Sequence, residues 1–203
     1  MTATLEPPIQ DAIAPHRFSA AEYHKMHESG VFPEGQRTQL IRGEIYFVAA
    51  MGAAHYRAIR VLNKALSKKY GDISSVVPQA PIIFWDDSEP EPDFALVSLE
   101  CANDPPFARD VLLTIEISDS TLKFDRNKKL AEYARSGIQE SWILNLIDAQ
   151  LEVYRQPSGE QYLQLQIVKP QMPVAPLFAP EVTLEWWTAL EVKATESAED
   201  TNG

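Results

Sequence analysis

The feature that most constrains this 203-residue chain is an apolar segment with a carboxylate in its interior. Residues 111–118, VLLTIEIS, have the aliphatic and β-branched composition of a buried strand. Glu116 lies there between two isoleucines. Because side chains alternate along a strand, Glu116 shares a face with Thr114 and Ser118, and that face becomes polar toward the end of the strand. Burying a carboxylate without a partner costs several kcal/mol, so the fold must supply one.

A second acid stands at the entrance of another predicted strand. Asp93 follows the proline that opens PDFALVS, residues 92–98. If this strand neighbours that of Glu116, the two carboxylates converge, and both cannot stay ionised without a cation. A hard divalent ion such as Mg²⁺ or Mn²⁺ prefers oxygen ligands and would resolve the conflict. The strand of Glu116 taken alone favours a simpler alternative, a structural salt bridge or a place at a wet sheet edge.

The order of the remaining segments predicts a single mixed α/β domain over residues 18–190. A flexible arm is expected at residues 1–17 and an acidic disordered tail at 191–203. The helix that separates the two most apolar strands predicts a crossover connection. Apolar periodicity and the positions of Gly and Pro indicate helices over residues 18–30, 53–70 and 122–136. They indicate strands over residues 38–50, 73–78, 80–85, 92–98, 111–118 and 140–147. A hairpin is expected over residues 151–168, with its turn at 157–159, and a short strand and helical turn over 182–190.

The helix after the strand of Glu116 changes the balance between these alternatives. Asp125, Lys129 and Tyr133 are spaced four apart and line one helix face. A crossover would bring this face over the sheet, where Lys129 could set an ammonium beside the carboxylates and steady a nucleophilic water or a developing phosphate charge. The alternative is an ordinary acid–lysine pair on a solvated helix face.

Composition limits the classes of function. The formal net charge is −11, but residues 86–104 carry seven acidic side chains and no Lys or Arg, so the total does not decide whether nucleic acid is a partner. One cysteine excludes a disulfide framework and a cysteine-based zinc site. No phosphate-binding or dinucleotide-binding glycine loop is present. No segment could span a membrane and no signal-peptide pattern opens the chain, so we expect a cytoplasmic protein.

Other residues are open to two interpretations. On the helix at 53–70, a cationic stripe could follow a phosphate backbone, or it is the solvated face of an amphipathic helix. His55 near its start is favoured as a core histidine over a dimer contact or a residue at the edge of a site. Glu44 follows a glycine bend and by itself indicates a surface hairpin. The stripe consists of Arg57, Arg60, Lys64 and Lys68.

The sequence resembles a known family in three ordered segments, QLIRGEI, EPDFALV and LTIEISDSTLKFDRNKKLAEYARSGIQESWILN. The family is that of Uma-type restriction endonucleases, long labelled a domain of unknown function and similar in turn to the PD-(D/E)XK nuclease superfamily. The likeness runs from about Phe18 to Leu190. The resemblance implies a three-layer restriction-endonuclease-like core, α/β or α+β, with a mixed sheet flanked by helices.

The resemblance also implies Mg-dependent cleavage of DNA. Asp93, Glu116 and the backbone carbonyl of Ile117 would hold Mg²⁺ or Mn²⁺, and Glu44 matches an additional acid ahead of the core. The superfamily pattern places a lysine two residues after the glutamate, where this chain has Ser118. In the resembled family that lysine lies on the following helix, where Lys129 matches and Lys128 is the alternative.

Three functions remain open. The favoured function is a metal-dependent endodeoxyribonuclease in which Lys129 assists the water nucleophile. The second is a non-catalytic nucleic-acid-binding or regulatory module on a nuclease fold, and the third is a structural protein whose acids form salt bridges. A homodimer is expected, because two sites related by a two-fold axis suit the two strands of a duplex.

Overall fold

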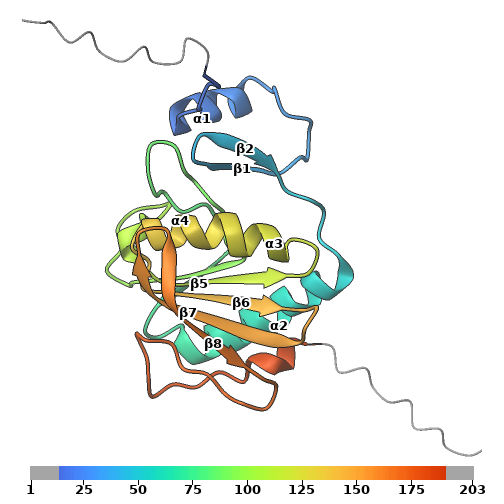
Figure 1. The fold of residues 1–203 in the computed structure, drawn as a ribbon, viewed down its shortest axis with the longest axis vertical. Helices are drawn as coiled ribbons and strands as arrows, with labels where there is room; N and C mark the ends of the chain where they lie inside the picture. The colour runs from blue at the N-terminus through green and yellow to red at the C-terminus, as the bar shows by residue number, and fades with distance from the viewer. Residues whose placement is uncertain (1–13, 191–203) are drawn as a thin grey trace, which may run out of the picture.

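The computed structural model describes residues 14–190; residues 1–13 and 191–203, on which most of the predicted arm and all of the predicted tail fall, lie outside it. A six-stranded sheet forms the centre of the molecule (Figure 1). Its strands lie side by side in sequence order; β5 and β6 pair in parallel, and the other neighbours pair antiparallel. They are β3 (Ser75–Pro78), β4 (Phe94–Val97), β5 (Val111–Ser118), β6 (Glu140–Asn145), β7 (Gln150–Ser158) and β8 (Gln161–Val168).

Helices cover both faces of this sheet, which confirms the predicted mixed sheet flanked by helices. The long helix α2 (Ala53–Tyr70) has the predicted bounds and packs on one face. The predicted crossover between β5 and β6 covers the other face. It consists of α3 (Leu122–Phe124), a π-helical turn (Asp125–Lys129) and α4 (Leu130–Arg135).

A two-stranded hairpin and the first helix form a smaller layer beside the sheet (Figure 1). The hairpin joins β1 (Thr38–Ile41) to β2 (Glu44–Phe47), so the segment predicted as strand over residues 38–50 contains two short strands. Its turn, Arg42 and Gly43, has positive φ angles of 52° and 70°, as a tight hairpin turn requires. A Cβ at Gly43 would lie 2.7 Å from the Cβ of Arg17, so the turn also needs glycine for close approach.

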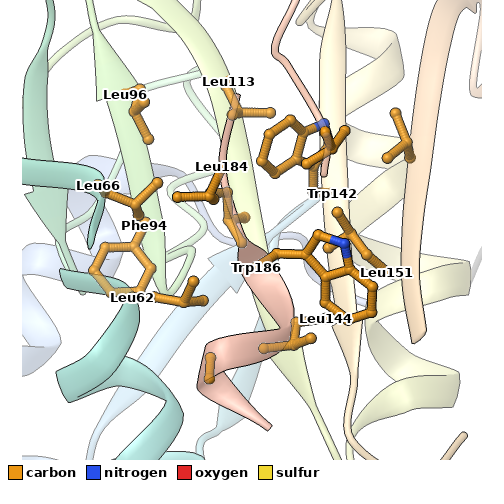
Figure 2. Close-up of a cluster of buried hydrophobic side chains, with 14 of the residues drawn as sticks. Leu62, Leu66, Phe94, Leu96, Leu113, Trp142, Leu144, Leu151, Leu184 and Trp186 are labelled. Atoms are coloured by element: carbon orange, nitrogen blue, oxygen red, sulfur yellow. The ribbon is translucent and has the colours of Figure 1, made fainter. Parts of the chain in front are cut away.

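Two apolar layers hold the sheet between its helices. The first joins α2, the sheet and the 3₁₀ turn at Trp186–Ala189 around two buried tryptophans, Trp142 and Trp186 (Figure 2). The second joins α4 to the opposite face through Leu130 and Tyr133. Seven of the eight residues of β5 are buried and five of the eight are apolar, which is why this strand stands out in the hydrophobic pattern.

Two local predictions are wrong. Residues 80–85 are not a strand of the sheet: Ile83 and Trp85 form isolated bridges, and this segment turns back on the residues just ahead of Asp93. Pro81 and the prolines at 90 and 92 carry no N–H, so a regular ladder cannot form there. The hairpin of β7 and β8 turns at residues 159–160, because pairing continues through Ser158. Within residues 14–190, no helix has the length and apolar composition that crossing a bilayer requires.

Helix α1 (Ala20–Glu28) begins at a capping box formed by Ser19 and Glu22. The backbone N–H of Glu22 donates to Ser19 Oγ at 3.2 Å, and the N–H of Ser19 donates to the Glu22 carboxylate at 2.9 Å. Replacing Ser19 with Ala is expected to lower the unfolding free energy by about 1 kcal/mol, because one N–H at the helix start loses its acceptor. Urea denaturation of both proteins measures this; equal midpoints would show that α1 contributes nothing to the cooperative unit.

Candidate functional site

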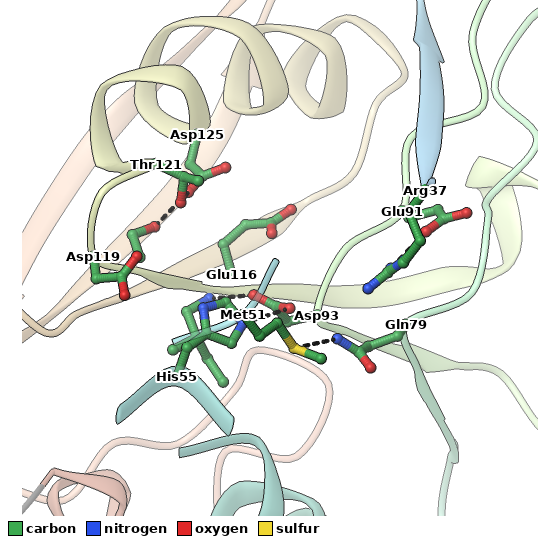
Figure 3. A network of polar contacts seen from close by, with 12 residues as sticks. Arg37, Met51, His55, Gln79, Glu91, Asp93, Glu116, Asp119, Thr121 and Asp125 are labelled. Atoms are coloured by element: carbon green, nitrogen blue, oxygen red, sulfur yellow. Dashed lines mark hydrogen bonds and ion pairs between the residues drawn. The ribbon is translucent and has the colours of Figure 1, made fainter. Parts of the chain in front are cut away.

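A cavity of about 480 Å³ opens where β4 and β5 meet the loop after β2 and the start of α2. Figure 3 shows Asp93, the residue before β4, beside His55, with Glu116 of β5 near by; both acids line the cavity. Its wall combines apolar and aromatic residues of 46–51 with a dense group of charges. The charged lining residues are Arg37, Glu91, Asp93, Glu116, Asp119, Asp125 and Lys129.

Glu116 is held from both sides in the deepest part of this site. The Lys129 ammonium donates to its Oε2 at 2.9 Å, and the Tyr133 hydroxyl donates to its Oε1. Desolvation by burial raises the pKa of Glu116 to about 8, against the pull of Lys129. Desolvation lowers the pKa of Lys129, but the carboxylates of Glu116, Asp125 and Asp93 outweigh it, so its pKa rises and the ammonium stays charged.

Asp93 is positioned by two donors. The His55 ring donates from Nε2 to Oδ1 at 3.0 Å, and the backbone N–H of Ile117 donates to Oδ2 at 2.8 Å. Burial raises the pKa of Asp93. The hydrogen bond and charge of His55, together with the charge of Lys129, lower it by more than burial raises it, so the pKa lies below its usual value. The predicted neighbourhood of the two strands is confirmed, because Phe94 pairs with Ile115.

Asp125 is a third carboxylate at the cavity, beside Asp93 and Glu116. Its Oδ2 accepts hydrogen bonds from Ser118 Oγ and Thr121 Oγ1, both at 2.7 Å. Asp125 and Lys129 begin and end the π-helical turn and are both buried at the cavity. Such widened turns occur mostly as single insertions in α-helices, often at functional sites. Ser118, at the end of β5, therefore ties the strand to the helical turn that carries Lys129.

The charges of the cavity fit a divalent cation by their chemistry. If all five lining carboxylates are counted as ionised and His55 as neutral, they and the two cations, Arg37 and Lys129, give a formal balance of −3. Phosphate would be repelled from such a surface, and hard carboxylate oxygens are ligands that Mg²⁺ prefers. Within residues 14–190, no three acidic, His or Cys side chains are already grouped as a ligand shell. Asp93 and Glu116 would supply ligands to such an ion, which would share oxygens that now accept hydrogen bonds.

The structure brings some predicted site residues together and separates others. Asp93, Glu116, Ile117 and Lys129 line the same cavity. Glu44 lies in a second hollow, where its carboxylate accepts from Arg17 and Tyr46. Lys128 points toward Glu44, with 3.8 Å between Nζ and Oε2. None of the four residues of the cationic stripe of α2 lines the cavity: Arg60, Lys64 and Lys68 are exposed, and Arg57 is half-buried.

Sequence reasoning missed the roles of three residues. His55 was favoured as a core residue, yet it holds Asp93 at the cavity wall. Tyr133 and Asp125 were recognised only as members of a helix face. Their spacing from Lys129 was the available signal, because four residues along a helix bring side chains to one side. No comparable signal marked His55, whose partner lies far away in the sequence.

The sequence matches a known family, and the fold is similar to that of a solved structure. A family model described as "Uma2: Putative restriction endonuclease" matches residues 20–191. Among solved structures, the chain is similar to a "putative nuclease belonging to DUF820" from Anabaena variabilis, with a TM-score of 0.65 and 19% sequence identity. The match covers 86% of this chain and 99% of that one, and at this identity it shows the fold. No protein with curated function matches.

Proposed function

This chain belongs to the Uma2 family of restriction-endonuclease type, and we propose that it is a metal-dependent endonuclease that hydrolyses phosphodiester bonds of DNA. The observation that carries the proposal is the convergence of Asp93, Glu116 and Lys129 on one cavity. Two carboxylates and an ammonium, drawn from two strands and a helix, form a group that can bind a cation and a water nucleophile together.

Asp93 and Glu116, with the backbone carbonyl of Ile117, are the residues that would hold Mg²⁺ or Mn²⁺. When bound, the ion supplies an acidified water and compensates the negative charge of phosphate. His55 and the Ile117 N–H fix the Asp93 carboxylate, and Tyr133 fixes that of Glu116. Preorganised carboxylates need little rearrangement on binding, which favours affinity and catalysis.

Lys129 is the group proposed to assist the attacking water. An ammonium has three N–H donors. In residues 14–190, two of them have acceptors, Glu116 Oε2 at 2.9 Å and the backbone carbonyl of Glu91 at 2.8 Å. The third remains to hold a water or a phosphate oxygen in the cavity. The two bonds also fix the ammonium in place, so it stabilises developing negative charge without reorganising.

Replacing Lys129 with Met is expected to reduce cleavage about a thousandfold, because the water loses its positioning donor. Binding of Mn²⁺ should persist, because removing a positive charge does not weaken attraction for a cation. Plasmid cleavage and calorimetric Mn²⁺ titration on the same sample measure both quantities. Lys128→Met is the matched control and should cut normally; loss of cleavage there instead would transfer the role to the neighbouring lysine.

The proposal itself is tested by incubating the wild-type protein with supercoiled plasmid and single-stranded DNA in Mg²⁺, Mn²⁺ or chelator. Divalent-dependent nicking or linearisation supports an endonuclease.

One observation favours the second candidate, a non-catalytic nucleic-acid-binding module: all carboxylate oxygens of Asp93 and Glu116 already accept hydrogen bonds from protein groups. DNA binding without cleavage in any of these ions would favour that module.

A further inference from the structure

The outer edge of β8 has the features of a strand that pairs with another chain. β8 is the last strand of the sheet, and within residues 14–190 its backbone ladder joins it to β7 alone. Over eight residues, QYLQLQIV, it contains no charge, proline or glycine. Exposed edge strands of monomers are usually blunted by lysines, prolines, bulges or shortness, because open backbone groups recruit other strands.

Alternate positions of β8 present large apolar side chains to solvent. Leu163, Leu165 and Ile167 are 69%, 53% and 41% exposed. Because side chains alternate, these three share one face of the strand. Leu165 is the central residue of the three, with the other two placed symmetrically before and after it. This spacing is unchanged when the strand is reversed, so two copies of β8 can face each other in antiparallel register.

The opposite edge of the same sheet shows how this fold protects an edge. β3 has four residues and ends at Pro78, which cannot donate to a further strand. The pairing of β3 and β4 is correspondingly short. The chain therefore blunts one edge by length and proline, and leaves the other long and uncharged.

We propose that β8 is the interface of a homodimer in which β8 strands of two copies pair antiparallel about a two-fold axis at Leu165. The two sheets would then join into one, with Leu165 beside Leu165 of the partner subunit. A closed two-fold contact consumes the open edge of both copies, so it stops at the dimer. This inference depends on the sheet edge and stands whether or not the cavity is catalytic.

Charge favours a second copy that meets at this strand. Each copy carries a formal charge of −11, so two copies repel one another at long range. A contact through β8, which has no charged residue, adds no repulsion between its own side chains and buries Leu163, Leu165 and Ile167. The dimer should consequently tighten as salt rises and screens the acidic surfaces. An interface made of salt bridges would weaken instead.

Light scattering after size exclusion, at low and high salt, tests the proposal on the full chain. The wild type should have the mass of a dimer. Leu165→Lys should raise the dimer dissociation constant about a hundredfold, because the two-fold axis would place the two lysine side chains next to each other, where their charges repel. Leu99→Lys is the matched control, an exposed leucine just after β4, which β5, β6 and β7 separate from β8 in the sheet, and should remain dimeric.

A cross-linking variant fixes the register independently. In a Cys101→Ser background, Leu165→Cys should form an intermolecular disulfide under mild oxidation, because directly opposed residues of antiparallel strands approach to about 5 Å. Leu99→Cys should not. A monomeric wild type, a Leu165→Lys variant that dimerises as well as the wild type, or a dimer in which Leu165→Cys fails to cross-link would each overturn the proposal.

Discussion

Replacing Glu116 with Gln is expected to abolish binding of Mn²⁺ and to reduce DNA cleavage by at least about a thousandfold. The amide has the shape of the carboxylate but lacks the negative charge that a cation requires. The fold should persist, because Gln can still accept a hydrogen bond from Lys129 or Tyr133. Calorimetric titration with Mn²⁺, plasmid cleavage and circular dichroism on one sample measure the three effects.

The matched control is Glu140→Gln. Glu140 is also fully buried in a strand of the sheet, but its partners are Arg155, Trp142 and the backbone N–H of Leu177, and it lies outside the cavity wall. This variant should lose stability and keep both metal binding and cleavage. Unchanged Mn²⁺ affinity in Glu116→Gln would show that Glu116 is a structural partner of Lys129 and that the metal assignment is wrong.

Replacing Glu152 with Gln is expected to lower the unfolding free energy at neutral pH by about 3 kcal/mol, the value of a pKa change from 4.5 to about 2. Burial raises the pKa of Glu152, but hydrogen bonds from Arg126, Asn145 and Tyr154 outweigh it and lower the pKa to about 2. Its carboxylate accepts from Arg126 Nε at 2.9 Å and from the Tyr154 hydroxyl at 2.7 Å.

The sign of the pH dependence follows from that depressed pKa. Because the folded protein holds Glu152 ionised more strongly than the unfolded chain does, its contribution is complete above about pH 4.5 and disappears as the pH falls toward 2. The difference between wild type and Glu152→Gln should therefore shrink by about 2 kcal/mol between pH 7 and pH 3. Urea denaturation at several pH values measures it. Glu181→Gln, an exposed control, should differ from wild type by less than about 0.5 kcal/mol; a pH-independent difference for Glu152 would contradict the mechanism.

The order of elements could be predicted from local pattern because the pattern and the final structure agree. The bounds of α2 follow from its apolar periodicity, and β5 follows from a run buried on both faces. The segment at 80–85 has the same apolar composition as a strand but lies among prolines. Whether this segment forms a strand of the sheet depends on which carbonyls accept hydrogen bonds from its N–H groups. Here the acceptors are the carbonyls of Ser88, Pro90 and Pro106, which lie outside the sheet strands.

Only those residues of the candidate site could be predicted that are unusual within their own helix or strand. Glu116 is anomalous within its own strand, and Asp93 stands at the entrance of another, so both were recognisable. His55 was not, because its helix shows an ordinary amphipathic pattern and its contact with Asp93 exists only once α2 packs beside β4. The π-helical turn at Asp125–Lys129 is equally invisible, since its sequence reads as regular helix.

The place of Trp186 in the core has a consequence for protein synthesis. This residue is among the last described, yet it lies in the same buried cluster as Leu62 and Leu66 of α2. A domain folds as a unit when its core is complete, and α2 emerges from the ribosome long before the tryptophan that covers it. The nascent chain therefore holds an exposed apolar face through most of its translation, and the cavity between β4, β5 and α2 acquires its final shape only when nearly all of residues 14–190 have been made.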